Sequence, residues 1–167
     1  MIKVPESVFV GAGAVLTGDV HLDEGSSVWF NAVLRADLAP TYVGENSIIE
    51  DNVVCHGGEA GPIRVGRNVT VGHSAILHSC TIEDDALIGM GAIIMNRSHI
   101  GRGAVVGAGA VVVGGTEIPD GMLAVGNPAH VIKPVSDELA AANAEGVKRY
   151  LELAKEQMAG AADTIVK

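Results

Sequence analysis

IEDDALIGMGAIIMNRSHIGRGAVVGAGAVVVGGTEI, residues 82–118, carries an aliphatic residue at every sixth position. The recurring residues are Ile82, Ile88, Ile94, Ile100, Val106, Val112 and Ile118. A period of six matches neither the 3.6 residues of a helical turn nor the two-residue alternation of an ordinary strand. It suits a coil of three short strands, each with one inward side chain and one tight corner. The stretch therefore predicts a β-solenoid with an aliphatic core.

The same repeat extends toward the N-terminus, with three interruptions. The earlier inward anchors are Val10, Leu16, Leu22, Val28, Leu34, Val43, Ile49, Cys55, Val65, Val71 and Leu77. Glycine often follows an anchor, and we expect these glycines to give the corners conformational freedom: Gly11, Gly44, Gly66, Gly72, Gly89, Gly101 and Gly107. The six-residue count breaks after Leu34, Cys55 and Leu77. Such breaks commonly mark loops on the functional face.

The composition indicates one narrow, regular domain in a chain of 167 residues. Hydrophobic residues make up 48% of the sequence but aromatic residues only 3%, so the core is built from small side chains. A net charge of −9, with no cluster of Lys or Arg to offset it, disfavours nucleic-acid and membrane partners. The N-terminus lacks a signal-peptide pattern, so we expect a cytoplasmic protein. Cys55 and Cys80 are expected as reduced thiols.

The repeat ends near residues 126–128, where the pattern becomes helical. A linker through Lys133-Pro134 leads to residues 136–138, Ser-Asp-Glu, which are typical of a helix N-cap and an acidic first turn. Apolar residues then recur at roughly helical spacing: Leu139, Val147, Tyr150, Ala154 and Met158. We predict a solenoid over residues 1–134, a helix packed on it over 135–160, and a tail over 161–167.

Counting three repeats to each coil places polar residues of distant repeats above one another. Arg35, His56 and His78 follow the fifth, eighth and eleventh anchors and should form an outward ladder at one corner, ~4.8 Å apart. His56 and His78 could then share a metal ion. His73 lies two places after the tenth anchor, on another face, above Asp51. A neighbouring subunit of a threefold trimer is therefore the expected source of a third ligand.

Three segments carry a recognisable order and spacing. They are WFNAVLRAD at residues 29–37, IIEDNVVCH at residues 48–56 and VGHSAILH at residues 71–78. With them the chain resembles the γ-class carbonic anhydrase family, from the N-terminus to about Pro134. Hexapeptide acyltransferases share the repeat and the Gly-Asn-Pro-Ala ending at residues 126–129, but not this three-histidine set. The resemblance implies that the all-β solenoid is a left-handed parallel β-helix of hexapeptide repeats, with a C-terminal α-helix.

The resemblance also implies a metal centre in a homotrimer. His56, His73 and His78 look like the ligands of a catalytic Zn²⁺, with Fe²⁺ or Co²⁺ as alternatives, and Arg35 and Asp37 look like the charged pair that ties neighbouring subunits. Three imidazoles leave an open position at which bound water ionises near neutral pH. The implied reaction is the reversible hydration of carbon dioxide to bicarbonate by that hydroxide.

Other residues resemble parts of the same site. Glu50 stands where the family usually has Gln, and Asp51 beside it matches the usual Asp. A carboxylate at position 50 holds the proton of the water more tightly than an amide, so activity is expected to be modest. Two further candidates are Tyr150, which resembles a C-terminal tyrosine near the metal, and Glu59, which resembles acidic proton-transfer residues after the first histidine.

Two other classes of function remain open from the sequence. One is a CoA-dependent enzyme, either an acyltransferase with a histidine as general base or an acyl-CoA thioesterase. The other is a non-catalytic binding or assembly subunit, although such relatives often lose metal ligands. Cys55 is expected to fill the core and Cys80 to lie near the site without binding metal. The remaining histidines are expected to be structural or solvated: His21, His99 and His130.

Overall fold

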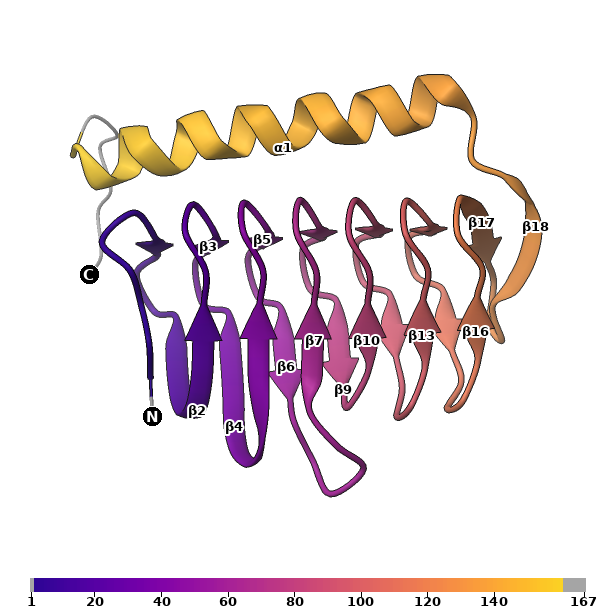
Figure 1. Cartoon of the computed structure of the whole chain (residues 1–167), viewed down its shortest axis with the longest axis horizontal. Helices are drawn as coiled ribbons and strands as arrows, with labels where there is room; N and C mark the ends of the chain where they lie inside the picture. Colours follow the sequence, from indigo (N-terminus) through magenta and orange to yellow (C-terminus); the bar gives the residue numbers. More distant parts are fainter. Residues whose placement is uncertain (1, 161–167) are drawn as a thin grey trace.

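The computed structural model describes residues 2–160, and the predicted tail over 161–167 lies outside the described residues. Short strands wind into a stack of coils, and one long helix runs back along the stack (Figure 1). The predicted β-solenoid with a C-terminal helix is thus confirmed. Among residues 2–160 there is no helix long and apolar enough to cross a membrane.

The strands form three flat faces. The first face contains β1 (Phe9–Val10), β3 (Ser27–Val28), β5 (Ile48–Ile49), β8 (Thr70–Val71), β11 (Leu87–Ile88), β14 (Val105–Val106) and β17 (Met122–Val125). Two longer strands, β2 (Val15–Leu22) and β4 (Val33–Val43), bend around a corner and belong to both other faces. The second face continues with β6 (Val54–His56), β9 (Ile76–His78), β12 (Ile93–Ile94) and β15 (Val111–Val112). The third continues with β7 (Ile63–Val65), β10 (Thr81–Ile82), β13 (His99–Ile100) and β16 (Glu117–Ile118).

The interior is a column of anchor side chains, as the repeat predicts. Most anchors are fully buried, including Leu34, Leu77 and Ile94. Val10 is an exception, since 40% of it is exposed in the first coil. Each coil shields its neighbour, so an anchor in a terminal coil is covered on one side only.

The glycines after the anchors do not serve the purpose expected from the sequence. Gly44 and Gly72 have ordinary backbone angles, and a Cβ at Gly72 would lie 2.8 Å from the backbone nitrogen of Met90. These positions need glycine because the next coil approaches closely. The left-handed conformation falls two residues later, for example at Asn46 with a φ of 59° and at Ser74 with a φ of 61°. Asparagine adopts that conformation more readily than most residues.

The C-terminal helix, α1 (Asp137–Met158), begins as predicted, because the Ser136 side chain accepts a hydrogen bond from the backbone N–H of Leu139. Val147 and Ala154 are buried against the solenoid, whereas Met158, the last residue of the apolar spacing, is 47% exposed. The expected linker is partly wrong. Residues His130–Pro134 form β18, antiparallel to β17, which closes the last coil by pairing with its exposed edge.

Aromatic residues concentrate where α1 meets the first face. The rings of Phe9 and Trp29 lie 4.9 Å apart, and the rings of Trp29 and Tyr150 lie 5.1 Å apart at 89°. This small second core is separate from the aliphatic interior. It fixes α1 to the early coils and so determines where Tyr150 lies.

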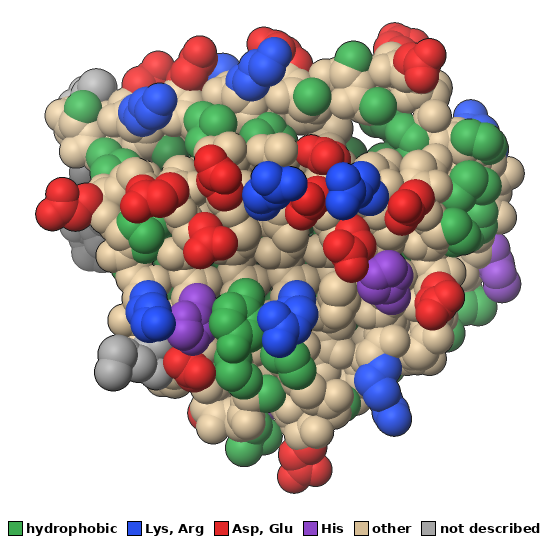
Figure 2. Space-filling model, in the orientation of Figure 1, with side chains coloured by type: hydrophobic (Ala, Val, Ile, Leu, Met, Phe, Trp, Pro, Cys, Tyr) green, Lys and Arg blue, Asp and Glu red, His purple; other side chains and the backbone are tan. Residues whose placement is uncertain are grey.

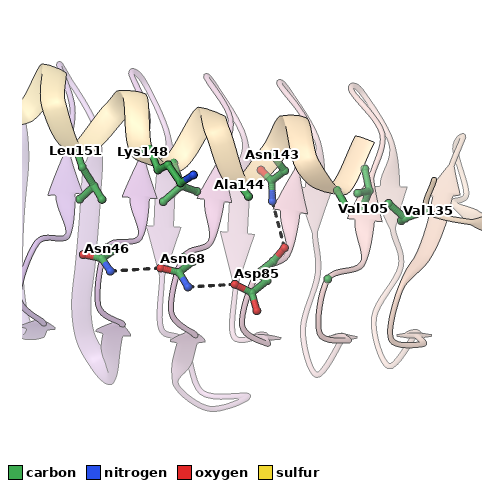
Figure 3. Close-up of a pocket in the computed structure, with 12 residues that line it drawn as sticks. Asn46, Asn68, Asp85, Val105, Val135, Asn143, Ala144, Lys148 and Leu151 are labelled. Atoms are coloured by element: carbon green, nitrogen blue, oxygen red, sulfur yellow. Dashed lines mark hydrogen bonds between the residues drawn. The ribbon is translucent and has the colours of Figure 1, made fainter. Parts of the chain in front are cut away.

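A cavity of about 380 Å³ remains between α1 and the corner that joins the third face to the first. Figure 2 shows the hollow beside the helix near the end where the helix begins. At this corner Asn46, Asn68 and Asp85 form a column in which each side chain bonds to the next (Figure 3). Asn143 of α1 donates to the backbone oxygen of Asp85 (Figure 3). The side-chain amides of Asn46, Asn68 and Asn143 each donate to an oxygen at this corner. The column is therefore structural.

Candidate metal centre

The histidine ladder predicted from the repeat forms at the corner between the second and third faces. Parallel pairing sets Arg35 of β4 against His56 of β6, and His56 against His78 of β9. His56 Nδ1 lies 3.0 Å from His78 Nε2, and the rings are nearly perpendicular at 76°. Cys55 and Leu77, the anchors beside these histidines, are fully buried and hold the strands in register.

His56 is held from both sides by charged residues of the preceding coil. Arg35 Nη2 lies 3.2 Å from His56 Nδ1, and Asp37 Oδ1 lies 3.1 Å from His56 Nε2. Arg35 and Asp37 also bond to each other at 2.7 Å. Loss of hydration raises the pKa of Asp37, but hydrogen bonds from Arg35 and His56 outweigh it and keep the pKa below its usual value. Within one chain, this pair therefore orients a histidine.

His78 has a partner that the sequence did not reveal. Its Nδ1 lies 2.5 Å from Oδ1 of Asn96, which follows β12 in the next coil. Asn96 lies two residues after its anchor, whereas the ladder position in that coil is occupied by Met95. A count of ladder positions therefore passes over Asn96, although a polar residue beside a ladder of histidines is a usable signal.

His73 lies on another face, after β8, as the repeat predicts. Its Nε2 is 3.1 Å from Glu50 Oε2, and its Nδ1 is 3.0 Å from Asp51 Oδ2. The His73 backbone N–H also donates to Glu50 Oε2 at 2.8 Å. Glu50 is buried, whereas 40% of the His73 side chain is exposed. His73 is thus a surface residue whose two ring nitrogens meet carboxylates from the preceding coil.

Tyr150 joins this second group of residues from α1. Burial raises the pKa of its hydroxyl group, and a hydrogen bond to Glu50 and the nearby charges of Glu50 and Asp51 raise it further. A cavity of about 270 Å³ lies beside Glu50 and Tyr150, bordered by Leu87 and Leu139. Tyr150 therefore fixes the buried end of Glu50 and connects the helix to His73.

Glu59 lies in the loop that projects between β6 and β7 (Figure 1). The loop is closed by a bridge between Gly58 and Gly61, and Gly58 donates its backbone N–H to the Ser79 side chain. A Cβ at Gly58 would lie 2.8 Å from a ring carbon of His78, so the loop passes directly beside the ladder. Glu59 itself is exposed to solvent.

One chain does not bring the three histidines together. Over residues 2–160, no group of three His, Cys, Asp or Glu side chains is placed so that it could hold a metal ion. Cys55 and Cys80 are free but buried, and burial raises the pKa of the Cys80 thiol to about 12, so neither offers a thiolate ligand. His56 and His78 form one half of a possible site and His73 the other.

Two of the other histidines, His21 and His99, have local roles. His21 stacks on Tyr42 with ring centres 4.8 Å apart and bonds to Asp19 at 3.0 Å. His99 pairs with Glu83 at 3.0 Å. These contacts agree with the structural roles expected for isolated histidines.

The fold and the stacked polar corners place the chain among the hexapeptide-repeat proteins with a left-handed β-helix. Residues 79–114 match the family model described as bacterial transferase hexapeptide, six repeats. Two solved structures share the fold along most of their length. A Bacillus cereus protein provisionally named an acetyltransferase has a TM-score of 0.92 and 40% identity, covering 94% of this chain and 91% of that one. A hexapeptide transferase family protein from Anaplasma phagocytophilum has a TM-score of 0.87 and 33% identity, covering 90% and 89%.

Named relatives identify the family within this class. The carbonic anhydrase of Geobacillus kaustophilus is 43% identical over 136 residues, which cover 81% of this chain and 75% of that protein. The "Probable carbonic anhydrase" of Methanocaldococcus jannaschii is 38% identical over 152 residues, which cover 91% and 96%. The chain belongs to the γ-class carbonic anhydrase family. It matches 57% of the length of the mitochondrial gamma carbonic anhydrase 2 of Arabidopsis thaliana, at 40% identity.

Proposed function

We propose that this protein is a homotrimeric, metal-dependent carbonic anhydrase that interconverts carbon dioxide and bicarbonate at sites shared between subunits. The observation that carries the proposal is the split histidine set. Two imidazole nitrogens lie 3.0 Å apart on one corner, and a third imidazole is exposed on a different face. A threefold arrangement that sets the corner of one subunit against the flank of the next would unite them.

The residues present fit a divalent metal ion. His56 and His78 offer neutral nitrogen donors at a partly exposed corner, and imidazole suits Zn²⁺ as well as Fe²⁺ and Co²⁺. His73 of a neighbouring subunit would complete the set by releasing one carboxylate. A bound ion with three imidazole ligands supplies an acidified water molecule near neutral pH.

The flanking residues would then orient the reacting water and move its proton. Glu50 is held by the His73 backbone and by Tyr150, so its carboxylate can accept a hydrogen bond from water beside His73. Asp51 can keep the His73 ring in place through Nδ1. Glu59, exposed on the loop beside His78, can pass protons to buffer.

An exposed aliphatic strip supports subunit contact beside the ladder. Val15, Val54 and Ile76 project from the second face with 50%, 40% and 39% of their surfaces exposed. Contiguous apolar surface of this kind is typical of a protein interface. Arg35 and Asp37 lie at the same corner and would tie neighbouring subunits while orienting His56.

Subunit mixing tests the shared site. His73→Ala and His56→Ala variants should each be inactive and metal-poor, but co-refolded trimers should regain about one quarter of the sites, because each mixed trimer has one interface with all ligands. The readouts are zinc per trimer by mass spectrometry and carbon dioxide hydration by stopped flow. A site contained in one chain would give no recovery. His21→Ala, outside the site, is the matched control.

A CoA-dependent acyltransferase is the second candidate, favoured by the provisional name of the Bacillus cereus relative. The same purified protein distinguishes the two functions. Turnover of an acyl-CoA that persists after chelation, with no hydration of carbon dioxide, would support the transferase. A non-catalytic subunit would bind metal and show neither activity.

A further inference from the structure

We propose that Asn96 is a positioning residue of the metal centre, which holds His78 in the tautomer that leaves Nε2 free for the metal ion. The inference rests on the function proposed above and deepens it.

The Asn96 side chain determines which nitrogen of His78 carries the hydrogen. Its Oδ1 lies 2.5 Å from His78 Nδ1. An amide oxygen can only accept a hydrogen bond, so the hydrogen is on Nδ1 and His78 Nε2 carries a lone pair. That lone pair points toward His56, because Nε2 lies 3.0 Å from His56 Nδ1.

The tautomer of His56 is determined independently, from the coil on its other side. Arg35 can only donate, and its Nη2 lies 3.2 Å from His56 Nδ1. Asp37 accepts from His56 Nε2 at 3.1 Å. His56 Nδ1 therefore carries a lone pair, which accepts from Arg35. With no hydrogen on Nδ1, His56 does not donate to His78 Nε2, 3.0 Å away, so the lone pair of His78 Nε2 stays available to a cation.

Without Asn96 the pair would close on itself. A neutral His78 could move its hydrogen to Nε2 and donate it to His56 Nδ1 in place of Arg35, because the two ring nitrogens already lie at hydrogen-bond distance. A metal ion would then have to break that bond and reverse the tautomer before binding. Asn96 thus prevents a histidine–histidine hydrogen bond that would compete with the metal.

The backbone around Asn96 is held by hydrogen bonds to the neighbouring coils. The Asn96 carbonyl accepts a hydrogen bond from Gly115 N–H at 2.9 Å, and Arg97 N–H donates to the Ser79 carbonyl at 2.7 Å. These bonds tie the corner to the coils on both sides. The Asn96 side chain therefore projects toward His78 from a backbone that both neighbouring coils hold in place.

The test compares Asn96→Leu, which removes the acceptor, with Asn96→Asp, which retains it. Long-range ¹H–¹⁵N spectra of the metal-free, full-length protein report the His78 tautomer, and competition with a chelator gives the dissociation constant for Zn²⁺. We expect Asn96→Leu to shift His78 toward the Nε2–H form and to weaken zinc binding by about 10- to 100-fold. Asn96→Asp should keep the wild-type tautomer and bind zinc at least as tightly as the wild type.

Asn143→Leu, on α1 and away from the ladder, is the control and should change neither readout. Wild-type tautomer and zinc affinity in Asn96→Leu would overturn the role of Asn96 while leaving the proposed function intact. Equal weakening in Asn96→Leu and Asn96→Asp, with unchanged tautomers, would also overturn it, since only packing would have been disturbed. Failure of the wild type to bind zinc would overturn both proposals.

Discussion

The Asn46–Asn68–Asp85 column and the His56–His78 ladder are built in the same way, yet only the first is complete. Both lie at corners of the solenoid, and both stack polar side chains of successive coils. In the first column each amide donor meets an oxygen of the next residue, and α1 lies over the corner (Figure 3). In the second, two ring nitrogens lie 3.0 Å apart, and neither ring donates to the other in the tautomers that Arg35, Asp37 and Asn96 favour. The difference teaches that a stacked corner is structural when its polar side chains hydrogen-bond to one another. A corner that leaves a ring nitrogen without a hydrogen-bond donor can instead bind a metal ion.

Removal of a ladder histidine should have the largest effect. His78→Ala deletes one of the two donors on the corner, so zinc should fall well below one ion per subunit and carbon dioxide hydration by at least about a thousandfold. Asn68→Gly, the matching change in the other column, should leave zinc content unchanged. Metal analysis and stopped-flow hydration measure both. A His78→Ala protein with full zinc content would remove the distinction between the corners.

Truncating a core side chain near either corner should lower the free energy of unfolding by a similar amount. The two truncations should differ in their effect on metal binding. Leu77 and Ile82 are both buried in the same aliphatic interior, so Leu77→Ala and Ile82→Ala should each lower the free energy of unfolding by about 3 kcal/mol. Only Leu77 adjoins His78, so only Leu77→Ala should weaken zinc binding. Urea unfolding at fixed protein concentration, with and without zinc, measures the two effects.

Val113→Ala is the control for those truncations, since Val113 is 43% exposed. Its stability should stay within about 0.5 kcal/mol of the wild type. Equal loss of zinc affinity in both core variants would show that the ladder responds to general loosening of the solenoid.

Changes in the asparagine column should have a smaller effect, on stability alone. Asn68 has a φ of 54° and bonds to both Asn46 and Asp85. Asn68→Ala loses these bonds and adds left-handed strain, so it should destabilise the protein by about 2 kcal/mol. Asn68→Gly loses the bonds without the strain and should cost about 1 kcal/mol less. Thermal unfolding distinguishes them, and equal losses would argue against strain.

The sequence was sufficient for the solenoid and for the ladder because both follow from one count. A buried anchor every sixth residue fixes the register, and register alone sets His56 beneath His78 and keeps His73 on another face. The role of the glycines could not be obtained in that way. It depends on the close approach of the next coil, which a count along one chain does not contain.

Residues away from the anchor and ladder positions were harder to anticipate. Asn96 is one position away from the ladder and reaches His78 only because the corner turns there. Met158 has helical spacing but lies beyond the aromatic contacts that hold α1. The assignment of His56, His73 and His78 as ligands remains a prediction from the sequence and the family, since it depends on how subunits meet.

The smallest expected effect concerns Glu50, which lies beside His73 on the face that would complete the His56–His78 site of a neighbouring subunit. Glu50→Gln keeps an oxygen for the His73 N–H and for Tyr150, but removes the negative charge that holds the proton of the reacting water. The hydration rate should therefore rise by about threefold at equal zinc content. If the rate instead fell by about a hundredfold, Glu50 would be the base that takes the proton. Stopped-flow hydration of zinc-matched samples decides between these roles, because the first treats Glu50 as an orienting group and the second as a proton acceptor.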